Sequence, residues 1–302
     1  MNKYIENLRT KSPLIHNITN MVTINDVANI ELACGARPIM AMAPQEMEEV
    51  TGICDGLNLN IGTPSQERFE AMRIAALTAK KKGIPITLDL VGVGVSRFRM
   101  DFVQSLLSDV KIDVIKGNLS EIKAVMEHGR CEGGVEVTDE ADEVDIMELA
   151  GAVAQKFDCV AVITGETDFI AEVSDYGGDG TNTSFDGNMQ VSGSRFVEKY
   201  KADSVTGGNP MMKKVTGTGC QLSGLISSFV AANTEDKFGA AKAALQCMKR
   251  AGELAADDLF CKEPETIRKT GETAQESGYI MGNATYRDRI IDAVYRICCE
   301  PH

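Results

Sequence analysis

The sequence predicts an α/β fold in which a central, mostly parallel sheet carries helices on both faces. Short apolar stretches alternate with longer stretches whose apolar residues recur at helical spacing, as at 84–89 followed by 102–107. Strand–helix alternation of this kind is typical of parallel sheets. The short stretches are strongly apolar, as expected of strands that are covered on both faces.

Local signals define the elements of residues 1–164. Gly35 ends one helix, Pro44 begins a turn after a strand, and the Ser65 hydroxyl is placed to cap a long helix. The expected strands lie within 12–20 and at 37–42, 56–63, 84–89, 112–116 and 159–164. The expected helices lie within 1–13 and at 24–34, 45–52, 65–82, 102–107, 119–126 and 141–157.

Residues 171–212 differ from the rest of the chain because they are rich in Gly, Asp, Ser and Asn. We expect short antiparallel strands at the sheet edge at 169–173 and 188–191, with the remainder forming a lid or a subunit contact. Three further helices are expected at 222–232, 238–256 and 287–298. No repeat or clear linker interrupts the pattern, so we predict a single domain over residues 1–302.

Composition narrows the class of protein. The chain has 302 residues with 43% apolar and 25% charged residues, which are globular values. Its net charge of −13 argues against binding of nucleic acid or an anionic membrane. No apolar run reaches transmembrane length, and the start is too polar for a secretory signal. The nine cysteines form no C-x-x-C pair and the three histidines are scattered, which predicts reduced thiols in a cytoplasmic protein without a His/Cys metal site.

A glycine-rich turn at 215–219 precedes the apolar helix and is the strongest candidate site. The entrance of a helix exposes amide groups and a partial positive charge, and glycine lets the backbone approach a ligand closely. Gly217 and Gly219 therefore predict a cradle for a phosphate or a phosphoryl group. Cys220 would lie in the first turn, where the pKa of a thiol is expected to fall. The alternative is an ordinary loop-to-helix connection with a buried, inert cysteine.

Polar residues also follow several of the expected strands. Asp89, Lys116 with Asn118, and Thr164 with Glu166 stand at carboxyl ends of strands, where ligands bind in folds of this class. Neither common phosphate signature is present. There is no G-x-x-x-x-G-K-[ST] segment, and the loop at 92–94 lacks a third glycine at the dinucleotide-binding spacing.

Seven segments of the chain together resemble the hydroxyethylthiazole kinases, a family with a ribokinase-like fold. The resemblance covers about residues 12–256 and rests on the order and approximate spacing of short motifs. These motifs are His16-Asn17-Ile18-Thr19-Asn20, Pro38-Ile39-Met40-Ala41, Leu59-Asn60-Ile61-Gly62-Thr63, Asp89 with Val91-Gly92, Lys116-Gly117-Asn118 with Glu121, Ile163-Thr164-Gly165-Glu166, and Thr216-Gly217-Thr218-Gly219-Cys220.

The resemblance implies transfer of the γ-phosphoryl group of ATP, with Mg²⁺, to the hydroxyl of 4-methyl-5-(2-hydroxyethyl)thiazole in thiamine salvage. It also implies a homotrimer whose substrate sites lie between subunits. By position in the motifs, the implied roles are substrate binding for Met40, Gly217 and Asn20, nucleotide binding for Lys116, Thr164 and Gly219, Mg²⁺ binding for Glu121 and Asp89, and orientation or deprotonation of the substrate hydroxyl for Cys220.

Two departures from the family pattern leave other functions open. Lys116 stands where the family usually has arginine, and Leu90 stands where it usually has proline. A lysine keeps the charge but loses the planar fork of the guanidinium group. A non-catalytic thiazole or nucleotide binder is therefore one alternative. A second alternative is another enzyme of the fold, either a pyrimidine kinase or an ADP-dependent hydrate dehydratase. Cys220 in place of aspartate argues against both of these enzymes.

Each candidate residue also has a purely structural interpretation. Met40 lies on an apolar strand and suits a core position. Asn20 is a candidate turn cap, and Asp89 is a candidate cap for the amides at 92–94. Glu121 would favour the first turn of its helix whatever its function.

Overall fold

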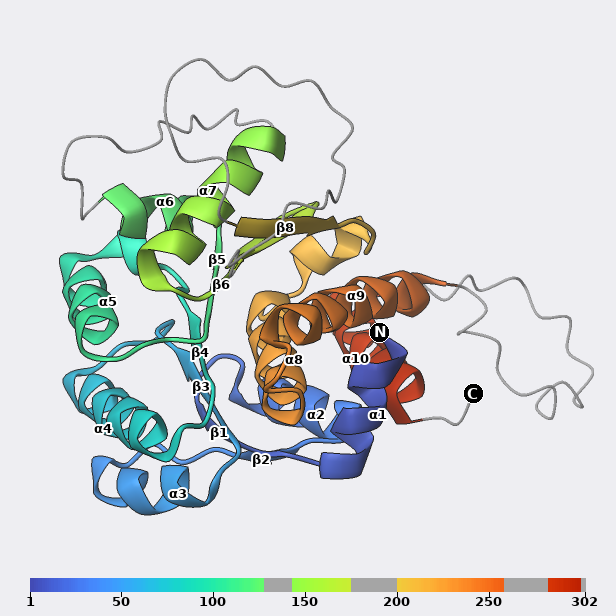
Figure 1. Ribbon diagram of the computed structural model, residues 1–302. Helices are drawn as coiled ribbons and strands as arrows, with labels where there is room; N and C mark the ends of the chain where they lie inside the picture. Colours follow the sequence, from blue (N-terminus) through green and yellow to red (C-terminus); the bar gives the residue numbers. More distant parts are fainter. Residues whose placement is uncertain (128–142, 175–199, 258–281, 300–302) are drawn as a thin grey trace, which may run out of the picture.

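An eight-stranded sheet forms the centre of the computed structural model, which describes residues 1–127, 143–174, 200–257 and 282–299 (Figure 1). The strand order is β2-β1-β3-β4-β5-β6-β7-β8. Strands β1 to β6 pair in parallel, and β7 and β8 extend the sheet in antiparallel fashion. The strands are β1 (Leu14–Ile18), β2 (Arg37–Ile39), β3 (Gly56–Asn60), β4 (Ile86–Asp89), β5 (Val114–Asn118), β6 (Val160–Thr164), β7 (Asp168–Val173) and β8 (Tyr200–Val205).

Helices cover both faces of this sheet and each face has its own hydrophobic core (Figure 1). One layer contains α1 (Asn2–Lys11), α2 (Ile24–Cys34), α8 (Thr218–Ala232), α9 (Lys237–Ala256) and α10 (Asn283–Cys299). The other contains α3 (Met47–Ile53), α4 (Gln66–Lys82), α5 (Arg97–Asp109), α6 (Leu119–Glu127) and α7 (Glu143–Phe157). Short 3₁₀ turns occur at Pro44–Glu46, Val93–Val95 and Pro210–Lys214.

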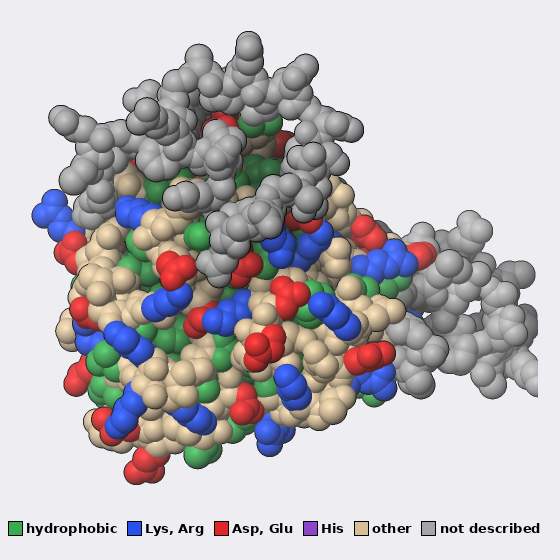
Figure 2. Space-filling view, in the orientation of Figure 1, with side chains coloured by type: hydrophobic (Ala, Val, Ile, Leu, Met, Phe, Trp, Pro, Cys, Tyr) green, Lys and Arg blue, Asp and Glu red, His purple; other side chains and the backbone are tan. Residues whose placement is uncertain are grey.

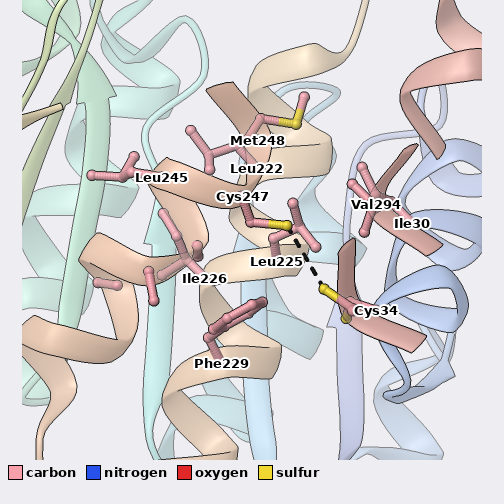
Figure 3. Close-up of a cluster of buried hydrophobic side chains, with 14 of the residues drawn as sticks. Ile30, Cys34, Leu222, Leu225, Ile226, Phe229, Leu245, Cys247, Met248 and Val294 are labelled. Atoms are coloured by element: carbon pink, nitrogen blue, oxygen red, sulfur yellow. Dashed lines mark hydrogen bonds between the residues drawn. The ribbon is translucent and has the colours of Figure 1, made fainter. Parts of the chain in front are cut away.

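The layer beneath α8 is packed by side chains from four helices. Figure 3 shows Leu222 of α8 beside Met248 of α9, and Ile30 of α2 beside Val294 of α10, in the same cluster as Phe229 of α8. The thiols of Cys247 and Cys298 lie 3.7 Å apart in this core and link α9 to α10. All cysteines that the structure describes are free thiols. Almost every residue of α8 is buried in this packing against the sheet, and this determines where its first turn lies.

The register of the parallel strands aligns three polar residues in a row. Asn60 of β3 pairs with Asp89 of β4, and Asp89 pairs with Lys116 of β5. Side chains alternate between the two faces along a strand, so all three point toward α8, while Leu59, Leu88 and Ile115 enter the opposite core. The α8-facing side of the sheet is thus polar at its carboxyl edge.

The predicted α/β class, with its mostly parallel sheet and two helical layers, is confirmed. Helix α5 is longer than expected because the Ser96 hydroxyl caps it by accepting from the Arg99 amide. The strand expected at 112–116 begins at Val114 and continues through Asn118 as β5, and β8 at 200–205 was not predicted. The strand expected at 188–191 lies outside the described residues.

The surface carries charges of both signs. On the face seen in Figure 2, acidic and basic side chains are interspersed, with apolar side chains between them. The net charge of −13 is therefore not gathered into one patch on this face. Among the described residues, no helix is long and apolar enough to cross a membrane.

Candidate active site

The entrance of α8 forms an amide-lined turn at the carboxyl edge of the sheet. Gly217 is its N-cap with φ of 89°, a left-handed conformation that favours glycine. A Cβ at this position would lie 2.4 Å from Thr23 Cγ2, so both the backbone angle and the space require glycine. The first helical hydrogen bond runs from the Gln221 amide to the Gly217 carbonyl. Helix geometry leaves the amides of residues 218–220 without an acceptor inside the helix, which suits an anionic ligand.

Cys220 lies in this first turn and receives hydrogen bonds from two asparagines. Asn20 Nδ2 is 3.1 Å and Asn60 Nδ2 is 3.2 Å from Cys220 Sγ. The side chain is 7% exposed. Burial raises the pKa of the Cys220 thiol, and the nearby charge of Asp89 raises it further, against the opposing effects of Lys116, Thr23 and Asn60. The expectation that a helix entrance would lower this pKa is wrong, because desolvation outweighs the favourable helix end.

Asp89 is fully buried and satisfied by three donors. Its Oδ1 accepts from Lys116 Nζ at 2.9 Å, and its Oδ2 accepts from Asn60 Nδ2 at 2.9 Å and Ser223 Oγ at 2.6 Å. Burial lowers the pKa of Lys116, but the charges of Asp89 and Cys220 outweigh that effect and raise it overall. The lysine is thus a cation at neutral pH. A Cβ at Gly219 would lie 3.2 Å from Lys116 Nζ, so glycine leaves the ammonium group room beneath the helix entrance.

Asn118 and Glu121 form a capping box at the start of α6. Asn118 Oδ1 accepts from the Glu121 amide at 2.9 Å, and Glu121 Oε2 accepts from the Asn118 amide at 2.8 Å. The other carboxylate oxygen, Oε1, accepts from the Gly92 amide at 2.8 Å. Glu121 therefore has a structural function, and each oxygen of its half-buried carboxylate, which accepts one of these hydrogen bonds, has the capacity to accept another.

These carboxylates fit Mg²⁺ only as a partial ligand set. Mg²⁺ at nucleotide sites takes one or two carboxylates and completes its octahedron with phosphates and water. Glu121 meets that requirement, whereas Asp89 is paired with the Lys116 ammonium. Among the described residues, no three His, Cys, Asp or Glu side chains are grouped so that they could hold a metal.

A cavity of about 250 Å³ opens beside the helix entrance. Thr164 and Gly219, both expected to contact nucleotide, line it. Leu222 and Met248 form its apolar side and belong to the core shown in Figure 3. A pocket with one apolar side and one amide-lined side suits a heterocycle that carries phosphates.

The structure brings five of the predicted residues into one cluster, places Thr164, Gly217 and Glu121 in the cavity wall, the helix entrance and the α6 cap described above, and leaves Met40 apart. Asn20, Lys116, Asp89, Gly219 and Cys220 form one connected cluster at the carboxyl edge of the sheet. Met40 follows β2 and is half-buried, with no described hydrogen bond or ion pair that links it to this cluster.

The segment around Met40 is held by a buried histidine. His16 Nε2 lies 3.1 Å from the Ala41 carbonyl, and Nδ1 lies 2.9 Å from Thr51 Oγ1. Burial lowers the pKa of His16 against the effect of the Ala41 carbonyl, so the ring is neutral at physiological pH. His16 therefore has a structural role, since its ring bonds to Ala41 and Thr51 rather than to Cys220.

Two members of the cluster were not identified as site residues from the sequence. Asn60 contacts Asp89, Cys220 and Asn20, and Ser223 contacts Asp89. The sequence contained a signal that could have identified each of them as a site residue. Asn60 ends a strand that neighbours the one ending in Asp89, and Ser223 lies one helical turn beyond Cys220 on the same face.

Comparison with known proteins decides the family. The hydroxyethylthiazole kinase family model matches residues 5–183 and 190–266. This chain belongs to that family. A hydroxyethylthiazole kinase of Clostridium acetobutylicum is 39% identical over 298 residues, covering 97% of this chain and 93% of the relative. Another from Thermoanaerobacter pseudethanolicus is 39% identical over 263 residues, covering 87% of this chain and 89% of the relative.

Solved structures agree with this membership of the hydroxyethylthiazole kinase family. The structure of a hydroxyethylthiazole kinase protein from Pyrococcus horikoshii OT3 superposes with a TM-score of 0.72 at 30% identity, over 98% of this chain and 94% of that one. A ribokinase-like superfamily protein of Enterococcus faecalis V583 superposes with a TM-score of 0.55 at 12% identity, over 97% of this chain and 89% of that one. The second likeness supports the ribokinase-like fold alone.

Proposed function

We propose that this member of the family transfers the γ-phosphoryl group of ATP to the hydroxyl of hydroxyethylthiazole in thiamine salvage. The observation that carries the proposal is the position of Cys220. Its sulfur lies in the first turn of α8, beside amides with no helical acceptor and within hydrogen-bond distance of Asn20 and Asn60. Phosphoryl transfer asks a protein mainly for alignment and charge stabilisation, and both are available here.

In this proposal the nucleotide occupies the cavity between the β6–β7 turn and α8. Thr164 and Gly219 contact ATP, and the amides of residues 218–220 donate to the phosphoryl group in transfer. Lys116 adds a positive charge directly beneath Gly219. These donors offset ATP charge locally in a protein whose net charge is −13.

Glu121 and Asp89 are the residues that would hold Mg²⁺ in this site. The ion, when bound with ATP, neutralises phosphate charge and so lowers the barrier to attack by the hydroxyl oxygen. Glu121 offers its half-buried carboxylate directly. Asp89 would hold the ion only if Lys116 turned from this carboxylate to phosphate oxygens, because its oxygens are already bonded to Lys116, Asn60 and Ser223.

Cys220 orients the substrate hydroxyl or accepts its proton. The two amide donors on its sulfur fix the thiol in place. Asn20 and Gly217 would hold the thiazole beside it, and Met40 would contribute across the subunit interface of the proposed homotrimer. General bases contribute about 10²–10⁴-fold to turnover. Since the pKa of Cys220 is raised, a base role requires turnover to increase with pH across the range in which the thiol ionises. An orienting role gives no such increase.

A coupled assay with ATP, Mg²⁺ and hydroxyethylthiazole tests the function directly. We expect the thiazole monophosphate as product, and we expect Cys220→Ala to lower kcat while the affinity for ATP changes little. Binding of both ligands without product would instead support a non-catalytic binder. Phosphorylation of a pyrimidine alcohol alone would support a different kinase of this fold, and unchanged kcat in Cys220→Ala would remove the thiol from the mechanism.

Further parts of the proposal concern the whole chain. We infer a single domain over residues 1–302, a homotrimer with substrate sites between subunits, and a cytoplasmic location consistent with the free thiols. Sedimentation velocity of the full chain tests the trimer. A sedimentation coefficient that corresponds to 32.6 kDa would show a monomer and contradict it.

A further inference from the structure

One wall of the cavity, the β6–β7 turn, is held in place by a lysine from a distant helix. Lys249 of α9 donates from Nζ to the Gly165 carbonyl at 3.1 Å and to the Glu166 carbonyl at 2.8 Å. Its third contact is with Asp168 Oδ2 at 3.3 Å. Asp168 in turn accepts from the Gly165 amide at 2.9 Å. The turn that follows Thr164 is therefore held at two of its carbonyls and one of its amides.

The ammonium group of Lys249 is committed to the protein itself. A lysine has three N–H donors, and the turn supplies two carbonyls and a carboxylate. Lys249 is 8% exposed and Asp168 is 4% exposed. Although Lys249 lines the cavity, its donors already have partners, so any effect of this lysine on a ligand there would pass through the turn that it holds.

The same side chain supports the opposite wall. A Cβ at Gly208 would lie 3.2 Å from Lys249 Cδ, and the Gly208 amide donates to Glu253 of the same helix at 3.2 Å. Gly207 and Asn209, next to this residue, line the cavity. Lys249 thus lies between the turn at 164–168 and the loop at 207–209 and contacts both walls of the cavity.

Stability alone does not account for this ion pair. Replacing a buried ion pair by apolar side chains of similar volume is often neutral or stabilising, because the charges lose hydration. The buried lysine and aspartate at this cavity wall instead determine the position of the backbone that they bond to. They fix one carbonyl pair and one amide that apolar packing would leave without partners.

We propose that Lys249 and Asp168 form a positioning pair that sets the β6–β7 turn so that Thr164 and Gly165 meet the nucleotide. The inference rests on the proposed function, in which ATP occupies this cavity. It predicts a selective effect. Loss of the pair weakens ATP binding, whereas hydroxyethylthiazole, bound on the Asn20 and Gly217 side, keeps its KM.

The test compares three variants of the full chain. Lys249→Met removes the ammonium group and leaves Asp168 buried without its cation, so this variant is expected to be less stable. Adding Asp168→Asn removes that unpaired charge while its side-chain oxygen still accepts from Gly165. The matched control is Lys242→Met, which breaks an ion pair between the same helix and Asp203 without touching the turn.

Calorimetric titration with ATP and thermal unfolding give separate readouts. We expect the double variant to recover the Tm lost in Lys249→Met while its Kd for ATP stays at least about tenfold above wild type, the loss typical of charge-assisted hydrogen bonds. Lys242→Met is expected to bind ATP as wild type does.

The outcomes separate the inference from the function on which it rests. A double variant that binds ATP as tightly as wild type overturns the positioning role, because stability alone would then explain the pair. An equal rise in Kd for Lys242→Met overturns it too, since any broken ion pair on α9 would have the same effect. Absence of ATP binding by the wild-type chain overturns the proposed function itself, and the inference with it.

Discussion

Asn60 connects every polar member of the Cys220 cluster except Lys116 and Ser223, and its replacement by alanine removes four hydrogen bonds at once. Its Nδ2 donates to Asp89 at 2.9 Å and to Cys220 at 3.2 Å, and its Oδ1 accepts from Asn20 at 3.1 Å and from the Gly62 amide at 3.0 Å. Each such bond contributes about 0.5–1.5 kcal/mol net, and buried groups left unpaired add to the loss.

Losses in one network are not additive, so we expect Asn60→Ala to lower the free energy of unfolding by about 2–4 kcal/mol. Urea unfolding at pH 7 measures that change. Turnover should fall by about 10²-fold at a temperature where the variant is still folded, because Cys220 loses one of two groups that hold its sulfur. Asn29→Ala, an exposed helical site bonded only within its own helix, is the control and should change neither quantity.

Asn60→Asp tests the electrostatic part of the reasoning. The new carboxylate would face Asp89 at hydrogen-bond distance, and like charges in a buried site raise the pKa of a carboxyl group. A folded-state pKa above the unfolded value means that stability is present at low pH and lost as pH rises through the folded pKa. The variant should therefore be least stable at alkaline pH and recover on acidification. Stability equal to wild type at pH 8 would refute this account of the cluster.

Two other positions yield predictions of different kinds. Burial raises the pKa of Glu31 well above its ordinary value, so the free energy of unfolding falls as pH rises toward that pKa. In urea titrations, the free energy of unfolding of Glu31→Gln should exceed that of wild type by an amount that grows by up to about 1.4 kcal/mol per pH unit above the unfolded pKa. A difference that stays constant with pH would contradict this. Gly217→Ala should lower the free energy of unfolding by about 1–3 kcal/mol and remove most of the turnover, because φ at this position is 89° and Thr23 occupies the space that a Cβ would need. A Tm equal to that of wild type would contradict this prediction.

The fold was largely predictable because its strands carry strong local signals. Apolar runs such as 84–89 and caps such as Ser65 specify elements without tertiary information, and the Ser65 hydroxyl does accept from the Arg68 amide. The edge strand β8 is mostly half-buried and has neither a long apolar run nor a regular alternation, so its pairing with β7 depends on the sheet being present. The composition of the residues around β8 gave no signal for a strand comparable to the apolar run at 84–89.

The sequence predicted which residues belong to the site better than it predicted their pKa shifts. Strand-end polar residues and the glycine turn indicated Asp89, Lys116 and Cys220 correctly as neighbours. The direction of the Cys220 pKa shift was wrong, because desolvation depends on packing that the linear sequence does not contain. Lys249 could not be found at all, since it is one lysine among several on an amphipathic helix and its acceptors lie more than 80 residues away.

Burial of Cys220 has a consequence for reagents that form covalent bonds with cysteine. Its raised pKa leaves little thiolate at neutral pH, and the surrounding amides exclude bulky electrophiles. General alkylating agents and peroxides should therefore react slowly with it. A small electrophile shaped like the alcohol substrate would be brought next to the sulfur by binding, and such a compound offers a route to selective labelling of the protein.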